Sequence, residues 1–226
     1  MRPTLEGKGL ALPNSNKLRL RPDAQPSESY SDDSEFGSQL RLADIPQMSF
    51  DDSPEAHLLG SSFRPDAPFR AKISPPHEPG RILVIKGRVW GFDTKEPLGR
   101  AKMDIWHANA VGRYDYEDLI GHAHQGDFIN RARLYCDQNG YYEFETIHPG
   151  AYQTSIAVWR APHIHFRVRY VGYTTLVTQL FFKDDPYQNV DPYIKSSLII
   201  DLQEKRSNGL GYEEGVFDIV LTPSEI

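Results

Sequence analysis

From Arg81 to the C-terminus, short apolar runs alternate with clusters of turn residues. The runs are rich in β-branched and aromatic side chains, and Gly, Pro, Asn and Asp bound them, which is typical of β-strands. Such runs cover residues 81–92, 101–107, 141–147, 161–171, 174–182, 197–202 and 215–221. Convincing helical spacing is missing between them. The pattern therefore predicts an all-β fold, an antiparallel β-sandwich.

The first two runs are separated by residues 93–99, DTKEPLG, whose composition is that of a turn. In the second run, residues 101–107, Ala101, Met103 and Ile105 share one face. We expect the two runs to pair with each other as a hairpin.

A second turn is indicated at residues 137–140, DQNG, directly before the run 141–147. In that run, Tyr142 and Phe144 alternate with acidic residues. Because side chains alternate between the two faces of a strand, this order predicts one buried face and one solvated face.

Residues 1–75 differ from the rest of the chain. They are rich in Pro, Ser, Asp and Arg, and their apolar residues fall singly. We interpret them as an extended N-terminal arm, followed by a sandwich domain at residues 76–226. The arm is either disordered or wrapped over the domain or a neighbouring subunit. In the second case its anchors would be Phe50, Leu58, Leu59 and Phe63.

Candidate chemistry lies in the stretch WRAPHIHFRVRY, residues 159–170. Read with a period of two, one face carries Ile164, Phe166, Val168 and Tyr170, and the other carries His163, His165, Arg167 and Arg169. The Cβ atoms of the two histidines should lie ~7 Å apart, close enough for both imidazoles to reach one metal ion. Two hydrogen-bonded or solvated histidines remain the alternative. A metal site would need further ligands.

Carboxylate ligands do not follow this histidine pair, which disfavours both a 2-His-1-carboxylate iron(II) site and a cupin-type site. A second pair, His122 and His124, lies in a polar loop without a strand pattern and is the weaker candidate. Tyr114 and Tyr152 stand in glycine-marked contexts. Each is either a packed aromatic residue or, beside a trivalent cation, a phenolate ligand of the kind that favours iron(III).

Charge and composition narrow the range of partners. The 226 residues carry a net charge of −6, which argues against a nucleic-acid-binding surface and leaves small molecules as the expected partners. The single cysteine, Cys136, excludes an internal disulfide framework. Because the chain has neither a signal-like N-terminus nor an apolar run of ~18 residues, we expect a soluble, cytoplasmic protein without a membrane partner.

An ordered set of motifs resembles the intradiol ring-cleavage dioxygenases, most closely their protocatechuate 3,4-dioxygenase branch. The segments are GRVWGFDTKEPLGRAKMDIWHANAVGRYDY, DQNGYYEFETIHPGAY, WRAPHIHFRV and LVTQLFFKDDP, and together they span about three fifths of the chain. The resemblance implies an intradiol-dioxygenase-like sandwich that uses O2 to open the ring of a catecholic substrate, giving a cis,cis-muconate-type product. It also implies a homo-oligomer.

The resemblance further implies one Fe(III) per chain, held by Tyr114, Tyr152, His163 and His165. In that family pattern, Tyr152 is the axial ligand that leaves when substrate binds. Arg160 and Gln179 match the family's residues beside the substrate, whereas the alternative for Arg160 is a salt bridge to a surface carboxylate. Arg113, Arg131 and Arg133 fall in an expected polar loop, where we favour solvated side chains over recognition of a carboxylated substrate.

Some features depart from the family pattern. The interval between Tyr152 and His163 is short, and PGAY replaces the usual PGPY. An alternative interpretation is a non-catalytic module, a transthyretin-like or carboxypeptidase-regulatory-like sandwich, which shares the turn and strand patterns at 87–106 and 137–147. Such a module has no reason to carry the two tyrosines and two histidines together. The choice among protocatechuate, catechol, hydroxyquinol and larger phenols stays open.

Overall fold

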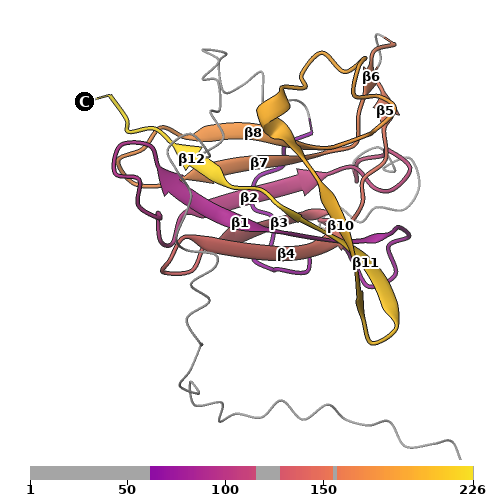
Figure 1. Ribbon diagram of the computed structural model, residues 1–226, viewed down its shortest axis with the longest axis horizontal. Helices are drawn as coiled ribbons and strands as arrows, with labels where there is room; N and C mark the ends of the chain where they lie inside the picture. The colour runs from indigo at the N-terminus through magenta and orange to yellow at the C-terminus, as the bar shows by residue number, and fades with distance from the viewer. Residues whose placement is uncertain (1–61, 116–127, 155–156, 226) are drawn as a thin grey trace, which may run out of the picture. The chain divides into compact units, whose positions relative to one another are not determined.

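Two β-sheets pack face to face in the computed structural model, which describes residues 62–115, 128–154 and 157–225 (Figure 1). The β1 sheet consists of β10 (Leu202–Ser207), β11 (Leu210–Val216), β1 (Ile82–Gly91) and β12 (Ile219–Leu221), with β4 (Tyr141–Ile147) also paired to β1. The β7 sheet consists of β3 (Arg131–Tyr135), β2 (Lys102–His107), β7 (His163–Arg169), β8 (Leu176–Phe182) and β9 (Ile199–Ile200). A two-stranded ribbon, β5 (Tyr152–Gln153) with β6 (Trp159–Arg160), and a 3-10 turn, η2 (Ser196–Leu198), complete the described elements.

The hydrophobic core lies between the two sheets. Leu83, Ile85 and Val89 of β1 face it from one side, and Ile164 and Phe166 of β7 face it from the other, each with no exposed surface. Burying both inner faces removes apolar side chains from water, which is the main favourable contribution to folding. The all-β sandwich predicted from the strand pattern is confirmed.

The sheets are mixed: most strand pairs are antiparallel, as predicted, and the others are parallel. Strand β1 pairs in parallel with β11 and with β12, and β8 pairs in parallel with β9. Parallel neighbours need a long crossover connection, and more than a hundred residues separate β1 from its parallel partners. Local turn signals report on hairpins and carry no information about such distant pairings.

The predicted hairpin between residues 81–92 and 101–107 does not form. Strand β1 pairs antiparallel with β4, with Ile85 opposite Phe144, whereas β2 pairs with β3 and β7 in the other sheet. The turn folds back on the end of β1, since the backbone N–H of Leu98 donates to the carbonyl of Val89 at 2.8 Å. The chain then crosses to the opposite sheet.

The turn at residues 137–140 forms as predicted. The Asp137 side chain accepts hydrogen bonds from the backbone N–H groups of Asn139 and Tyr141, both at 2.8 Å. Gly140 adopts a positive φ of 72°, which glycine tolerates without strain. Tyr142 and Phe144 of the following strand are buried, in agreement with the alternation of the sequence.

One hairpin was missed. Strands β10 and β11 pair antiparallel through a two-residue turn at Asn208 and Gly209, whose φ angles of 50° and 82° suit an Asn-Gly hairpin turn. The hairpin extends beyond the sandwich (Figure 1), and most of its residues are exposed or half-buried. Its strands therefore lack the apolar alternation by which the other strands were found.

Residues 62–75 lie against the sandwich, although the sequence analysis assigned them to the arm. Phe69 bridges to Arg133 of β3, and Ile73 is fully buried in the core. Phe63, an expected anchor, packs edge-on against Trp106 with ring centroids 5.1 Å apart. The other expected anchors and the remainder of the arm lie outside the described residues, and the boundary at residue 75 stays a prediction. None of the described helical turns is long and apolar enough to cross a membrane.

Candidate metal centre

The candidate site lies on the face of the β7 sheet that points away from the core. Ile164, Phe166 and Val168 of β7 point into the core with no exposed surface. The two histidines of the same strand, His163 and His165, point to the other side and are nevertheless buried, with 2% and 4% of their surfaces exposed. The predicted separation of the two faces is therefore confirmed, and the polar face is covered at the two histidines.

Neighbouring strands fix the position of His165. Trp106 of β2 and Gln179 of β8 stand opposite His165 in the register of the sheet. The Trp106 and His165 rings stack with their centroids 4.8 Å apart and an interplanar angle of 6°. The indole N–H of Trp106 donates to the hydroxyl of Ser62 at 3.1 Å, so the stacked pair is itself anchored by the segment before β1.

Tyr114 reaches the histidines from the connection between β2 and β3. It is 2% exposed, and its hydroxyl oxygen lies 3.1 Å from Nε2 of His165. The same nitrogen lies 3.1 Å from Nε2 of His163. Three polar atoms from two separate parts of the chain thus converge on one small volume.

Tyr152, in β5, completes the ring of four aromatic side chains. Its ring centroid lies 5.7 Å from that of Tyr114 and 5.6 Å from that of His163. Gly112 permits this approach, because it has a φ of 79° and a Cβ added there would meet the carbonyl oxygen of Ala151 at 2.2 Å. Unlike the other three side chains, Tyr152 is only half-buried.

Burial keeps both imidazoles neutral. Desolvation, followed by the charge of Arg160, lowers the pKa of His163 to about 3. Desolvation, and after it the electrostatic effect of His163, lowers the pKa of His165 well below its usual value. The Nδ1–H of His163 donates to the carbonyl of Ala161 at 2.6 Å, which leaves the Nε2 lone pair facing the site. Nδ1 of His165 is a buried nitrogen with no hydrogen-bond partner.

Tyr114 is a neutral phenol in the protein alone. Burial, followed by the neighbouring Tyr152, raises the pKa of Tyr114 well above its usual value. Forming a phenolate in this buried setting requires a compensating positive charge. A bound cation supplies one and lowers the pKa of its ligands.

This donor set fits a metal ion. Ligand atoms that share a metal at ~2 Å stand ~3 Å apart when they are at right angles, which is close to the 3.1 Å spacings found here. Within the described ranges, groups of three or more His, Cys, Asp and Glu with metal-binding geometry are absent. Imidazoles with phenol oxygens suit a hard trivalent cation better than a soft one. The structure brings Tyr114, Tyr152, His163 and His165 together, and their ligation of a metal stays a prediction.

Arg160 and Gln179 meet beside this cluster. Nη2 of Arg160 donates to Oε1 of Gln179 at 2.5 Å, and both side chains are buried. Arg160 also forms an ion pair with Asp191, at 3.0 Å, whose carboxylate has no exposed surface. Arg160 thus forms a salt bridge, as the alternative expected, but its partner carboxylate is buried rather than on the surface. Sequence reasoning missed Asp191, which is followed by proline in a polar loop and carries no local signal of its role.

The expectation of solvated arginines in the loop after Tyr114 was wrong for Arg131. Strand β3 begins at Arg131, which is 1% exposed and donates from Nε and Nη2 to the carboxylate of Asp115 at 2.7–2.9 Å. Arg64 binds the same carboxylate at 2.7 Å. Arg133 is partly buried and donates to the carbonyl of Ala67. Asp115 adjoins Tyr114, so this network fixes the backbone that carries the tyrosine.

Other predicted residues lie away from the cluster. Arg113 is exposed. His122 and His124 lie outside the described residues. His107, which sequence reasoning did not single out, is buried on the core side of β2, and its two ring nitrogens contact the Ala108 carbonyl at 2.7 Å and the Thr146 hydroxyl at 2.6 Å.

Comparisons with known proteins agree with this arrangement. A protein-family profile described as dioxygenase matches residues 66–223. Catechol 1,2-dioxygenase 2 of Acinetobacter lwoffii is 35% identical over 130 residues, covering 52% of this chain and 46% of that protein. The protocatechuate 3,4-dioxygenase beta chain of Burkholderia cepacia is 35% identical over 158 residues, covering 63% of this chain and 65% of that protein.

A solved structure shows the same fold. Catechol 1,2-dioxygenase from Acinetobacter sp. ADP1, inhibited by bound mercury, is similar with a TM-score of 0.64 at 29% identity, covering 71% of this chain and 60% of that one. This chain spans about half to two thirds of the length of the curated relatives it matches. The matched residues include the four converging side chains together with Arg160, Gln179 and Asp191.

Proposed function

The chain belongs to the intradiol ring-cleavage dioxygenase family, and from that membership we propose that it opens the ring of a catechol between the two hydroxyl groups. Both atoms of O2 would enter the product, a cis,cis-muconate-type diacid. The observation that carries the proposal is the convergence of Tyr114, Tyr152, His163 and His165, with the hydroxyl of Tyr114 and Nε2 of His163 each 3.1 Å from Nε2 of His165.

In this proposal, the two tyrosines and two histidines hold one Fe(III) per chain. The neutral imidazoles already present lone pairs, and two phenolates would neutralise most of the metal charge. Bound there, a ferric ion would supply a Lewis-acidic centre that makes a catechol ring reactive toward O2. The remaining steps depend on what the protein's own side chains bind, orient and protonate.

Of the four side chains, Tyr152 is the one best suited to move away from a bound metal ion and to accept a proton. It is half-buried on the short β5–β6 ribbon, whereas Tyr114, His163 and His165 are buried in the loop and sheet behind it. A ligand on such a short element can rotate outward with little loss of packing. Its phenolate oxygen would then take the proton of one substrate hydroxyl, a general-base role.

Arg160 and Gln179 would act on the substrate ring. A guanidinium stays cationic even in a buried site, so Arg160 is suited to stabilise negative charge that develops on the ring during attack by O2. Gln179 accepts a hydrogen bond from Arg160 at 2.5 Å, which directs the guanidinium over the face of the β7 sheet that carries the histidines. Neither group needs to change its charge during turnover.

The proposal is tested by colour, iron content and oxygen uptake. Purified protein with one equivalent of ferric ion should absorb in the visible range through tyrosinate-to-iron charge transfer. Addition of a catechol should consume O2, and both atoms of labelled O2 should enter the product. A colourless protein with a full complement of iron would rule out the two-tyrosinate centre. A protein that binds no iron would favour the non-catalytic module instead.

For the substrate, we propose a protocatechuate-like catechol. Its support is the 35% identity with a protocatechuate 3,4-dioxygenase beta chain over 158 residues, against 35% over 130 and 33% over 166 residues with two catechol 1,2-dioxygenases. A panel of protocatechuate, catechol and hydroxyquinol, compared by kcat/KM, tests this choice. A higher kcat/KM for catechol than for protocatechuate would contradict it. We further propose that the chain forms a homo-oligomer, which sedimentation of the full chain would test. We also propose a cytoplasmic location.

A further inference from the structure

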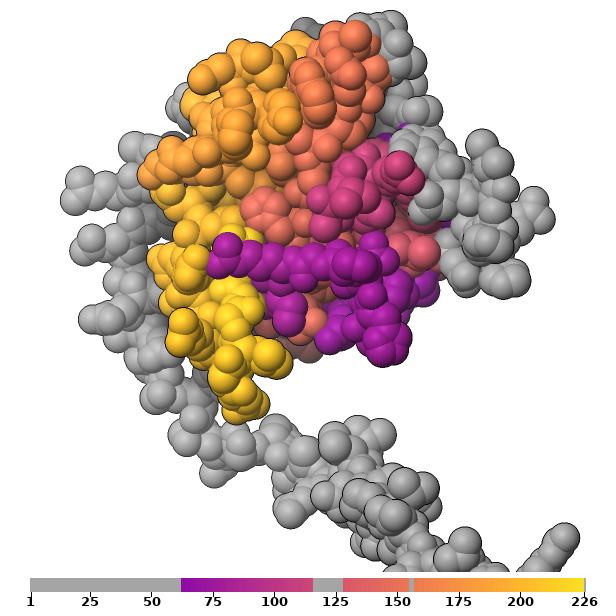
Figure 2. Space-filling view, turned by 90° about the vertical axis from the view of Figure 1, so that its right-hand side faces the viewer, coloured from indigo at the N-terminus to yellow at the C-terminus, as the bar shows by residue number. Residues whose placement is uncertain are grey.

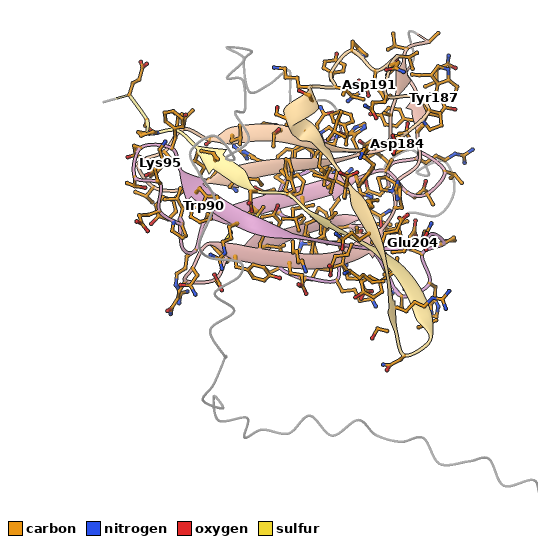
Figure 3. The ribbon with its side chains drawn as sticks, viewed as in Figure 1. Trp90, Lys95, Asp184, Tyr187, Asp191 and Glu204 are labelled. Carbon is orange, nitrogen blue, oxygen red and sulfur yellow. The ribbon has the colours of Figure 1, made fainter. Side chains whose placement is uncertain are left out.

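Asp191 lies in the segment that connects β8 to η2 and contacts the β5–β6 ribbon through Arg160. Its side chain has no exposed surface, and Figure 3 labels it beside the ribbon. Oδ2 accepts hydrogen bonds from Nε of Arg160 at 3.0 Å and from the backbone N–H of Ala161 at 2.9 Å. Oδ1 accepts from the backbone N–H of Tyr193 at 2.9 Å. All three donors therefore depend on one carboxylate.

The surroundings leave Arg160 little freedom. Asp191 holds the Nε edge of the guanidinium, and Gln179 accepts from Nη2 at 2.5 Å. The guanidinium carbon also lies 4.4 Å from the centroid of the Tyr193 ring. The edge, one terminal nitrogen and one face of the group are thus each in contact with a different residue.

The segment that carries Asp191 is fastened to the ribbon at a second point. Trp159, the neighbour of Arg160 in β6, stacks on Tyr187 with ring centroids 4.7 Å apart. Figures 1 and 2 show the orange residues of this segment beside the ribbon at the same end of the domain. Asp191 is therefore held by its own segment and is not itself positioned by Arg160 alone.

A second chain of contacts leads from Asp191 to a histidine. The Ala161 amide donates to Asp191, and the Ala161 carbonyl accepts from Nδ1 of His163 at 2.6 Å. Asp191 accordingly holds Ala161, whose carbonyl orients the imidazole of His163, as well as the guanidinium of Arg160. The contact to Arg160 is direct, whereas the effect on His163 passes through a backbone unit that β6 and β7 also hold.

We propose that Asp191 is a positioning residue that fixes the guanidinium of Arg160 toward the substrate, an inference that rests on the proposed dioxygenase function. A buried guanidinium that loses its carboxylate partner becomes an uncompensated charge and moves toward solvent. The site then keeps its four ring side chains but loses the cation at the position where charge develops on the substrate. Asp191 itself does not touch the substrate.

Asp191→Asn is the matched substitution, because it keeps the shape of the side chain. Whichever way the amide turns, its NH2 group faces an N–H donor, either at Tyr193 or at Arg160 and Ala161. We expect kcat/KM to fall by ~10–100-fold, the range typical of residues that orient a functional group, with iron content and the tyrosinate absorption unchanged. Asp191→Glu, which keeps the charge but shifts the carboxylate by one methylene, should also lower kcat/KM.

A double-mutant cycle separates action through Arg160 from general loosening of the site. If Asp191 acts through Arg160, then Asp191→Asn should change kcat/KM by less than twofold in an Arg160→Ala background. Equal losses in both backgrounds would overturn the proposal. The control is Asp104→Asn, since Asp104 is a buried carboxylate that pairs with Arg169, at 2.7 Å, rather than with Arg160. It should lower stability while leaving kcat/KM within about twofold.

A measurement that needs no turnover keeps this inference distinct from the proposed function. In the full chain, the Nε–H of Arg160 should give an NMR signal protected from exchange with solvent, because it is buried and bonded to Asp191. Asp191→Asn should accelerate that exchange at least tenfold, and Asp104→Asn should not. Unchanged exchange in Asp191→Asn would overturn the positioning role even if the enzyme is active. If exchange accelerates in Asp191→Asn but the parent protein lacks dioxygenase activity, the proposed function is refuted. The contact between Asp191 and Arg160 is then still supported.

Discussion

Around His163 and His165, both faces of the β7 sheet are buried, yet they are built from different chemistry. The inner face consists of aliphatic and aromatic side chains such as Ile164, Phe166 and Val168, which pack against the β1 sheet. The outer face carries His163, His165 and Gln179, covered by Tyr114 and other side chains from loops. A shift of one residue along β7 therefore separates a core position from a position in the candidate metal centre.

Two buried histidines on the adjacent strands make the contrast sharper. Near the core, both ring nitrogens of His107 have partners, the Ala108 carbonyl and the Thr146 hydroxyl, so no lone pair is left for a ligand. On the outer face, Nδ1 of His165 has no partner and Nε2 points at Tyr114 and His163. Because Nε2 of His165 converges with two other polar atoms, whereas both ring nitrogens of His107 are used within the fold, His165 is the histidine expected to bind a ligand. Burial alone thus does not distinguish a structural histidine from a functional one.

The largest effect is expected from removing a side chain of the outer face. His165→Ala should abolish the visible absorption of the iron-loaded protein and lower kcat/KM by on the order of 10³-fold or more, about 4 kcal/mol of barrier. The free energy of unfolding of the iron-free protein should change less than in Phe166→Ala, because the imidazole has one unsatisfied nitrogen. Iron analysis, turnover and urea unfolding measure these quantities. Normal iron content in this variant would contradict the assignment of His165.

The next residue along the strand should show the opposite behaviour. Phe166 has no exposed surface, and its ring lies 5.4 Å from that of Phe217 and 6.1 Å from that of Phe144. Phe166→Ala should lower the free energy of unfolding by about 3–5 kcal/mol through the loss of buried area and the cavity left behind. At temperatures where the variant stays folded, its iron content should match that of the parent. Phe166→Leu, as a control, should lose less stability.

A smaller, pH-dependent effect is expected from His107. Desolvation lowers its pKa from 6.5 to about 4, so the unfolded chain binds a proton more readily than the folded protein between these pH values. The associated stability is fully present above pH 6.5 and is lost as pH falls toward 4, by up to about 3 kcal/mol. Urea unfolding of the iron-free protein should therefore show a steeper pH dependence in the parent than in His107→Gln. Parallel pH profiles for the two proteins would exclude His107 as the cause.

The inner face was predictable because its signal is local. Alternation with a period of two identified the buried sides of β4 and β7 directly, and the Asp-Gln-Asn-Gly turn was recognisable from four residues. Pairing between strands was less accessible, since whether residues 93–99 close a hairpin or carry the chain across the sandwich depends on β4, more than forty residues later. The parallel partners of β1 are further away still.

The outer face was predictable only in part. The strand pattern placed His163 and His165 on one side, but spacing could not bring Tyr114 to them, and its place in the site came from resemblance to a family. Asp191 and the Asp115–Arg131 pair were missed because their partners lie 31 and 16 residues away. Ion pairs of this kind form only after the chain has folded, so their members look like ordinary charged loop residues in the sequence.

The smallest effect is expected at Tyr152, which tests the contrast within the outer face itself. Because Tyr152 is half-buried on the β5–β6 ribbon, Tyr152→Phe should fold with little loss of stability and retain iron through Tyr114, His163 and His165. Loss of a proton acceptor should slow substrate binding and lower kcat by ~10–100-fold, about 1.4–2.7 kcal/mol. Tyr114→Phe, in the buried position, should lose iron instead. Stopped-flow spectra of catechol binding and iron analysis compare the two variants. Equal iron loss in both would show that the half-buried and the buried tyrosine have equivalent roles.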